Sequence, residues 1–194
     1  MEQIKIKNKT YNIEEQIARR SYKLTRKNKE YFLKRFKEDS LELETFIEKS
    51  RELKISGISI PKIIAIDKKQ NLVLTAFIAG PTALDVLIGK NLDNAYFEKI
   101  FEMAWYAEHD NITPDFHPEH WKLHDRKLYY LKFDYNIGYS KEHSFDLEGL
   151  RFWFYTKELV KYLESKGLPV DKSRIKDEYA TNKEIVMCAY RYHL

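Results

Sequence analysis

The sequence predicts an α+β fold of two lobes that share one core: a small antiparallel β-sheet lobe with one helix over residues 1–78, and a mainly helical lobe over 79–194. Apolar and β-branched residues recur near every second position in most of the first part and at helical spacing in most of the second. The stretch AGPT at 79–82 interrupts both patterns, because glycine and proline break regular structure. We therefore place the boundary between the lobes there.

Three strands are expected at the start of the chain. The runs IKIKNKTYNI at 4–13, RSYKLTR at 20–26 and EYFLKRF at 30–36 are rich in aromatic and β-branched residues. The polar KNK between the last two predicts a hairpin tip at 26–29.

One amphipathic helix should follow these strands. In DSLELETFIEKSREL, Leu43, Phe46 and Ile47 lie at helical spacing, Asp39 or Ser40 is the expected N-cap, and ISG at 55–57 ends the helix. A second hairpin, KIIAID and LVLTAFI around a KKQN turn, is apolar enough to be buried on both faces.

The remainder is expected to be largely helical. ALDVLI at 83–88 begins it, and a longer helix follows in which Phe97, Ile100, Phe101 and Ala104 form one stripe. Residues 144–165 predict another amphipathic helix that starts at Ser144 or Asp146, and the C-terminal stretch is also helical in pattern.

Composition narrows the classes of function. The net charge of +4 favours anionic partners weakly and gives no strong nucleic-acid signal. Cys188 is the only cysteine, which excludes a disulfide framework and a cysteine-rich zinc module. No apolar signal region and no window of about 18 apolar residues is present, so we expect a soluble, cytoplasmic protein without a membrane span.

The segment DFHPEHWKLHDRKLYYLKFDY, residues 115–135, concentrates the chemistry of the chain. Its histidines and carboxylates are compatible with a metal site, with an altered phosphate-transfer site, or with a polar turn and hairpin on the surface. The context of the segment separates these possibilities.

That context resembles the protein-kinase-like superfamily. The order is strands, a strand with a lysine in YFLKRF, an acidic helix, a hairpin, the hinge TAFIAGPT, helices, and then the segment 113–135. The chain is most similar to the compact atypical branch of aminoglycoside and choline-type phosphotransferases, lipopolysaccharide Kdo kinases and the kinases of tRNA-modification complexes. The resemblance covers about residues 10–165 and implies a two-lobed kinase-like fold.

The resemblance assigns roles in the first lobe. Lys34 takes the place of the lysine that contacts the α and β phosphates of ATP, and Glu44 is the expected helical partner of this lysine, with Glu42 and Glu48 as rivals. A solvated helix face is the alternative for all three glutamates.

The hinge TAFIAGPT resembles the family's MEFIEG. This match implies that Thr75 lies at the back of an adenine pocket and that Ala76 and Ile78 supply backbone hydrogen bonds to adenine.

The segment 113–135 matches the family's catalytic loop and the hairpin after it. Asp115 falls on the catalytic aspartate, and His120 falls on the metal-binding asparagine. The apolar register of the hairpin puts Lys132 on the metal-binding aspartate and leaves Asp134 one position past Phe133.

These departures alter the implied chemistry. The resemblance implies ATP as cofactor, but a lysine cannot hold Mg²⁺. Arg19 to Ser21 replace the glycines that cover the phosphates, and the Phe32 ring is expected in the adenine space. Two outcomes follow for Lys132. In the first, Lys132 supplies charge beside Lys34, and His120 and Asp134 hold one displaced metal ion. The protein is then a weak phosphotransferase that acts on a small-molecule, lipid or protein hydroxyl.

In the second outcome, Lys132 pairs with Asp115 or Glu44 and locks the cleft. The protein is then a pseudokinase that binds a nucleotide or a protein partner.

Two other interpretations stay open. A histidine-based zinc or iron site would use His117, His120 and His124, although Pro118 disfavours one helix that presents all three. An RNA-stacking surface would use four tyrosines, although alternating aromatic residues in a strand are more often core: Tyr129, Tyr130, Tyr135 and Tyr139.

Asp146 supports the resemblance to kinases. It matches the family's aspartate that caps the catalytic loop, and an ordinary N-cap is the alternative.

Overall fold

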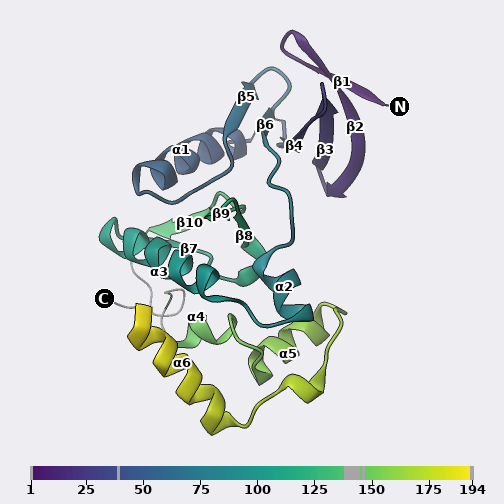
Figure 1. Cartoon of the computed structure of the whole chain (residues 1–194). Helices are drawn as coiled ribbons and strands as arrows, with labels where there is room; N and C mark the ends of the chain where they lie inside the picture. The colour runs from purple at the N-terminus through teal and green to yellow at the C-terminus, as the bar shows by residue number, and fades with distance from the viewer. Residues whose placement is uncertain (1, 39, 138–144, 146, 193–194) are drawn as a thin grey trace.

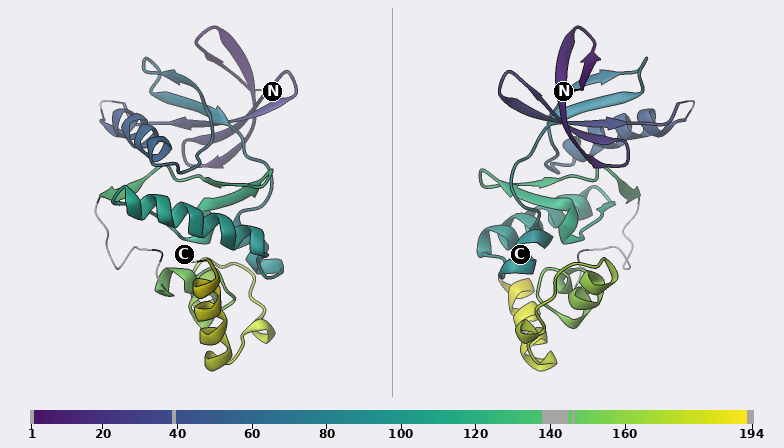
Figure 2. Two further views of the ribbon diagram at one scale, coloured as in Figure 1. Left: turned by 60° about the vertical axis from the view of Figure 1, so that its left-hand side comes forward. Right: turned by 90° about the vertical axis from the view of Figure 1, so that its right-hand side faces the viewer.

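The computed structural model describes residues 2–38, 40–137, 145 and 147–192 and has a mixed α+β fold. The calls on Asp39, Ser144, Asp146 and Tyr139 lie outside the described residues. Figures 1 and 2 show a curled sheet with helix α1 at one end of the molecule, helices α2–α6 at the other, and short strands between them.

The sheet of the first part is antiparallel throughout, with the order β1-β2-β3-β4-β6-β5 among the described strands. Its strands are β1 (Gln3–Ile6), β2 (Lys9–Ala18), β3 (Ser21–Arg26), β4 (Lys29–Arg35), β5 (Ile63–Asp67) and β6 (Leu72–Ala76). The central strand β6 is buried from Leu72 to Thr75, whereas the edge strand β5 is only partly buried. The expectation that both strands of this hairpin are buried on both faces is therefore wrong for β5.

The expectation of three strands before α1 is also wrong, because the run at 4–13 is two strands. Lys7 has a φ of 53° and turns the chain between β1 and β2. The predicted hairpin tip is confirmed, since Lys27 and Asn28 both have positive φ between β3 and β4. Positive φ at two successive residues matches the twist of a tight hairpin.

Helix α1 (Glu42–Ile55) has the predicted core face, with Leu43 and Phe46 buried. Its N-cap is Leu41, which makes no side-chain cap, and the hydroxyl of Ser40 accepts only a long bond of 3.4 Å from the Glu42 N–H. The expected Ser40 N-cap is therefore wrong. The predicted end is confirmed, because Gly57 adopts φ 83° just after the helix.

The second part begins with α2 and α3 and then returns through four short strands. Its elements are α2 (Ala83–Gly89), α3 (Asn94–His109), β7 (Ile112–Pro114), η1 (Pro118–His120), β8 (Trp121–His124), β9 (Lys127–Tyr130), β10 (Tyr135–Ile137), α4 (Leu147–Arg151), α5 (Lys157–Ser165), η2 (Lys172–Arg174) and α6 (Glu178–Tyr192). β8 pairs with β9, and β7 pairs with β10.

The single helix expected over 144–165 is wrong, since α4 and α5 are separate helices. The buried Thr156 begins α5, and its hydroxyl accepts a hydrogen bond of 3.1 Å from the Leu159 N–H. An N-cap has extended backbone, so it cannot continue a helix from α4.

One large hydrophobic cluster joins the two parts of the chain. It contains Phe36, Phe46 and Val73 from the first part and Phe101, Trp121 and Phe133 from the second. A smaller cluster, which includes Leu24 and Leu33, lies within the sheet. Among the described residues, no helix combines the length and the apolar character needed to cross a bilayer.

Candidate functional site

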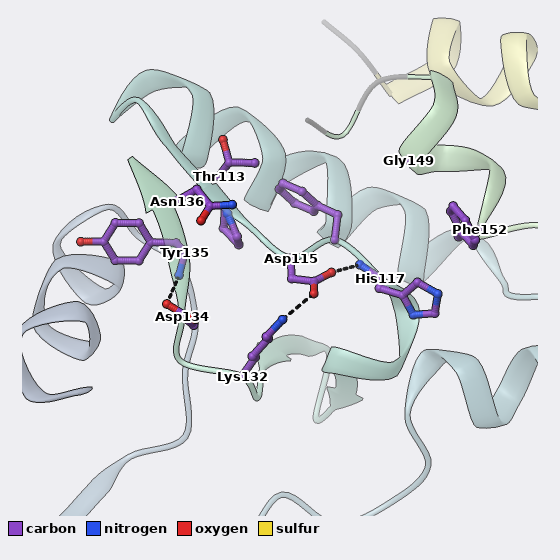
Figure 3. A pocket seen from close by; sticks show the side chains of 11 residues that line it. Thr113, Asp115, His117, Lys132, Asp134, Tyr135, Asn136, Gly149 and Phe152 are labelled. Carbon is purple, nitrogen blue, oxygen red and sulfur yellow. Dashed lines mark hydrogen bonds and ion pairs between the residues drawn. The ribbon is translucent and has the colours of Figure 1, made fainter. Parts of the chain in front are cut away.

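The ends of β7 and β9 and the start of β10 bring the predicted site residues of the second part together (Figure 3). Asp115 follows β7, and Asp134 precedes β10, whose Tyr135 pairs with Pro114 of β7. Lys132 lies in the turn between β9 and β10. The pairing of β7 with β10 therefore sets the distance between the two aspartates.

The carboxylate of Asp115 is held by three donors. Oδ2 accepts from Lys132 Nζ at 2.7 Å and lies 3.2 Å from His120 Nε2, while Oδ1 accepts from the His117 N–H at 3.0 Å. Partial burial would raise the pKa of Asp115, but hydrogen bonds from His120, Lys132 and His117 outweigh it and hold the pKa well below its usual range. The pairing of Lys132 with Asp115, one of the two outcomes expected from the sequence, is present.

Asp134 is bound by a lysine from the other part of the chain. Lys49 of α1 forms an ion pair with its Oδ1 and donates to the Tyr135 carbonyl at 2.9 Å. The same carboxylate oxygen accepts from the Tyr135 N–H at 2.9 Å. Helix α1 thus contributes a cation to this site.

Tyr130 connects the two aspartates through the backbone. Its hydroxyl donates to the Asp134 carbonyl at 2.6 Å and accepts from the Asp115 N–H at 3.0 Å. Burial raises the pKa of this fully buried phenol far above its usual value, so it stays protonated. Sequence reasoning named Tyr130 only for an RNA-stacking surface or a core and did not name Lys49. The pairing of β7 with β10 and the packing of α1 bring both residues to this site.

Lys34 lies on β4 and faces a small cavity of about 190 Å³. Its ammonium group is 5.3 Å from the centre of the Phe36 ring and 5.7 Å from that of Phe46. Burial lowers the pKa of Lys34, and the negative charges of Asp134 and Glu42 oppose this effect. The cavity is lined by Ser21, Phe32, Lys34, Phe46, Val73, Thr75, His120, Leu131, Lys132 and Phe133.

The predicted ion pair between Glu44 and Lys34 is wrong. Glu44 is exposed and lies 3.8 Å from Lys68 Nζ. Glu42, one of its rivals, is the α1 carboxylate whose charge acts on Lys34. Lys49 is the α1 side chain that pairs with Asp134, so the helix also contributes a cation to the site, which the sequence did not predict.

Of the three predicted hinge residues, only Thr75 lines the cavity at Lys34. Thr75 and Phe32 line it, as expected for the back of a pocket narrowed by a ring. Ala76 and Ile78 do not line it: the Ala76 N–H donates to the Lys62 carbonyl at 2.8 Å, and the Ile78 carbonyl accepts from Lys122 Nζ at 3.3 Å. The expectation that these two residues face a bound base is therefore wrong for the conformation described.

A second cavity of about 290 Å³ lies on the other side of Lys132. Asp115, His117 and Asp134 line it, as Figure 3 shows. Lys132 lines both cavities. The side chains of Lys34 and Asp115 therefore face neighbouring cavities that meet at Lys132.

The predicted metal ligands His120 and Asp134 have separate partners. His120 Nε2 lies 3.2 Å from Asp115 and 3.3 Å from Glu119, whereas Asp134 is paired with Lys49. In the part of the chain that is described, no group of three or more histidine, cysteine or acidic side chains is arranged to hold a metal ion.

Of the three histidines of the segment, His117 and His120 are neighbours, with ring centres 6.4 Å apart. Both ring nitrogens of His117 are buried without a hydrogen-bond partner, and the ring packs 4.1 Å from that of Tyr162. Burial lowers the pKa of His117 to about 4, so it is neutral at physiological pH. His124, the last residue of β8, lies 3.5 Å from Asp125 in the turn of the β8–β9 hairpin.

Neither a family model nor a curated protein matches the chain. The interpretation of the site therefore depends on its own geometry.

Proposed function

We propose that the chain is a two-lobed, kinase-like protein that binds the phosphate groups of a nucleotide such as ATP through lysines and does not transfer them. In this proposal it is a pseudokinase, a binding protein with a degenerate phosphotransferase site. The observation that carries it is that Lys34 and Lys132 line one cavity while the site's two aspartates are paired with lysines.

The lysines supply the charge that phosphate binding requires. Lys34 reaches the cavity from β4, Lys132 reaches it from the turn after β9, and the imidazole of His120 and the hydroxyl of Ser21 complete its polar lining. A bound phosphate would stabilise the charged form of Lys34, which burial disfavours in the free protein. Two ammonium groups of this kind neutralise phosphate oxygens as point charges.

The same contacts argue against Mg²⁺ and against phosphoryl transfer. Mg²⁺ needs oxygen ligands, but Asp115 is bound to Lys132 and Asp134 is bound to Lys49. A general base must accept a proton near the working pH, and the depressed pKa of Asp115 makes it a poor acceptor. The residues present therefore do not fit a Mg²⁺-dependent kinase.

The space for a base is limited. The cavity of about 190 Å³ is smaller than the roughly 300–1,000 Å³ of typical small-molecule sites, and Phe32 occupies one wall. We expect the polyphosphate to contribute most of the affinity and the base to contribute little. ADP, GTP and inorganic tripolyphosphate should then compete with ATP.

Isothermal titration and thermal shift with ATP in EDTA test the proposal. ATP should bind without a divalent ion and raise the midpoint of thermal unfolding. At a hundred times its dissociation constant, it should raise the free energy of unfolding by about 2.7 kcal/mol. Lys34→Ala should abolish the response, and Lys29→Ala, on the same strand but exposed at the hairpin tip, should not change it.

Two results would contradict the proposal. One is binding that requires Mg²⁺ and produces ADP. The other is no response to any nucleotide or polyphosphate together with a strong response to Zn²⁺, which would favour the histidine-based metal site.

A further inference from the structure

A third cavity lies under α6, away from the site described above. Its volume is about 520 Å³, within the range of roughly 300–1,000 Å³ typical of small-molecule sites. α6, α3, the loop before α3 and the connection between α4 and α5 contribute to its walls, and none of its lining residues lines either cavity at Asp115 or Lys34.

The inner wall of this cavity is aromatic. Phe97 of α3 stacks on Phe154 with ring centres 5.1 Å apart and on Tyr192 of α6 at 6.4 Å. Trp153 also borders the cavity but is fully buried, so it offers no surface to a ligand. Apolar surface of this kind gains free energy when a ligand removes it from water.

The Cys188 thiol in the interior of this cavity is uncharged. Cys188 of α6 lines the cavity, and burial raises its pKa to about 11, so the thiol is protonated at neutral pH. Met187 and Tyr190, which are 57% and 82% exposed, lie at the mouth on the same helix. The cavity thus leads from an apolar interior to solvent along α6.

The charged residues that line the cavity give it a basic rim, which consists of Arg174, Lys176 and Arg191. Among the described lining residues, Glu184 is the only carboxylate, and it is paired with Lys176. Arg174 donates to the Leu87 and Ile88 carbonyls and is thereby fixed in place. Arg191 is exposed and has no carboxylate partner in the described part of the chain, so it is available to an anion.

We propose that this cavity binds a single-chain amphipathic carboxylate, the chemical class of the fatty acids. The apolar chain lies along the aromatic wall formed by Phe97, Phe154 and Tyr192, and the carboxylate lies at the basic rim. The cavity size, the neutral interior and the excess of positive charge at the rim together select this ligand over a neutral or cationic one. This inference is independent of the nucleotide site.

Cys188 makes the test direct, because it is the only cysteine of the chain and it lines the cavity. The measurement is the rate of Cys188 alkylation by a maleimide in the full chain, with laurate added below its critical micelle concentration. Laurate should slow alkylation saturably, by about tenfold at ten times its dissociation constant. Dodecyltrimethylammonium, which has the same chain length and the opposite charge, should protect much less.

Two matched variants of α6 locate the ligand. Met187→Asp puts a carboxylate at the mouth, and Val186→Asp makes the same change at a neighbouring, 53% exposed position that does not line the cavity. The laurate concentration for half-protection should rise about tenfold in Met187→Asp and stay unchanged in Val186→Asp. Arg191→Gln should raise the laurate concentration for half-protection. Because the charge of Arg191 lowers the pKa of Cys188, protection is compared with the unliganded alkylation rate of the same variant.

Three results would overturn the inference. They are the absence of saturable protection by monomeric laurate, equal protection by the cationic detergent, and an equal effect of the two aspartate variants. Protection that occurs only with micelles or lipid vesicles would also overturn it, since the occupant would then be a lipid surface.

Discussion

Asp115 illustrates at the scale of one residue how an ion pair changes the expected chemistry. Because its folded pKa lies well below the unfolded value of 3.8, its contribution to stability is full above about pH 4 and is lost as the pH falls further. Asp115→Asn should therefore cost about 1–2 kcal/mol at pH 7, a value reduced for partial exposure, and the difference from wild type should shrink below pH 4. Urea unfolding at pH 3–7 measures it. A difference that is constant with pH would show that the carboxylate is not ion-paired in solution.

His117 should produce a separate pH dependence. Its pKa falls from 6.5 in the unfolded chain to about 4 in the folded one, so stability is full above about pH 6.5 and declines as the pH falls to 4. The slope for one such group is at most about 1.4 kcal/mol per pH unit. His117→Phe, which keeps a ring against Tyr162 and Phe152, should remove that slope in urea unfolding.

The exposed His124 provides the control for this prediction. His124→Phe should leave the slope between pH 6.5 and 4 in place, because its ring lies beside Asp125 on the β8–β9 hairpin and away from the buried site. If both variants flatten the slope equally, the buried imidazole is not its source.

Site residues that lie in one short segment of the chain were predictable from the sequence. Lys132 and Asp115 both belong to the segment recognised from its motif, and their pairing was one of two expected outcomes. The partner from α1 was not predictable, because Glu44 and Lys49 are five positions apart and project about 140° apart around the helix. Which of them faces the site depends on how α1 packs, and that is a tertiary property.

At the scale of elements, Thr156 decides where α5 begins. Its hydroxyl accepts from the Leu159 N–H at 3.1 Å and donates to the Arg151 carbonyl at 3.2 Å. Thr156→Ala should destabilise the protein by about 1–2 kcal/mol, the usual effect of losing an N-cap, whereas Thr156→Ser should retain most of the stability. Thermal unfolding followed by circular dichroism compares the variants. Equal losses in both would mean that the methyl group, and not the hydroxyl, is the important contact.

Lys49 should attach α1 to β10. A double-mutant cycle of Lys49→Met and Asp134→Asn should give a coupling energy of about 0.5–1 kcal/mol, modest because Asp134 is 56% exposed. The matched cycle at Lys68 and Glu44, exposed and 3.8 Å apart, should give a coupling energy near zero. Equal coupling energies in the two cycles would show that Lys49 does not hold α1.

Two boundaries between elements were not predicted from the sequence, and each has a local cause. A lysine and an asparagine at 7–8 turn the chain between β1 and β2, but both also fit within a strand pattern, so the sequence predicts one strand over 4–13. The apolar spacing of 144–165 continues through the break before Thr156, because the aromatic residues Phe152 to Tyr155 are buried or partly buried in an irregular connection. Periodicity does not distinguish such a connection from a helix.

For the whole molecule, the large cluster of buried residues crosses the boundary expected between residues 78 and 79. Phe46 of α1 lies 5.2 Å from Phe36 and 4.8 Å from Phe133, so one ring joins the sheet side to the segment that carries the site. The order of strands and helices was readable from periodicity, but this contact was not, because it joins residues that are distant in sequence. The shared core predicts one cooperative unfolding unit.

Tryptophan fluorescence tests this cooperativity, since all three tryptophans, Trp105, Trp121 and Trp153, lie in the second part of the chain. In the wild type, the urea transition of this signal should coincide with that of circular dichroism. Leu24→Ala, in the sheet's own cluster, should shift both transitions together although that cluster contains no tryptophan. Phe46→Ala should cost about 3–5 kcal/mol and separate the two transitions, because it removes the ring that couples the parts. If Leu24→Ala moves only the circular dichroism signal, the two parts unfold independently and the coupling assigned to Phe46 is absent.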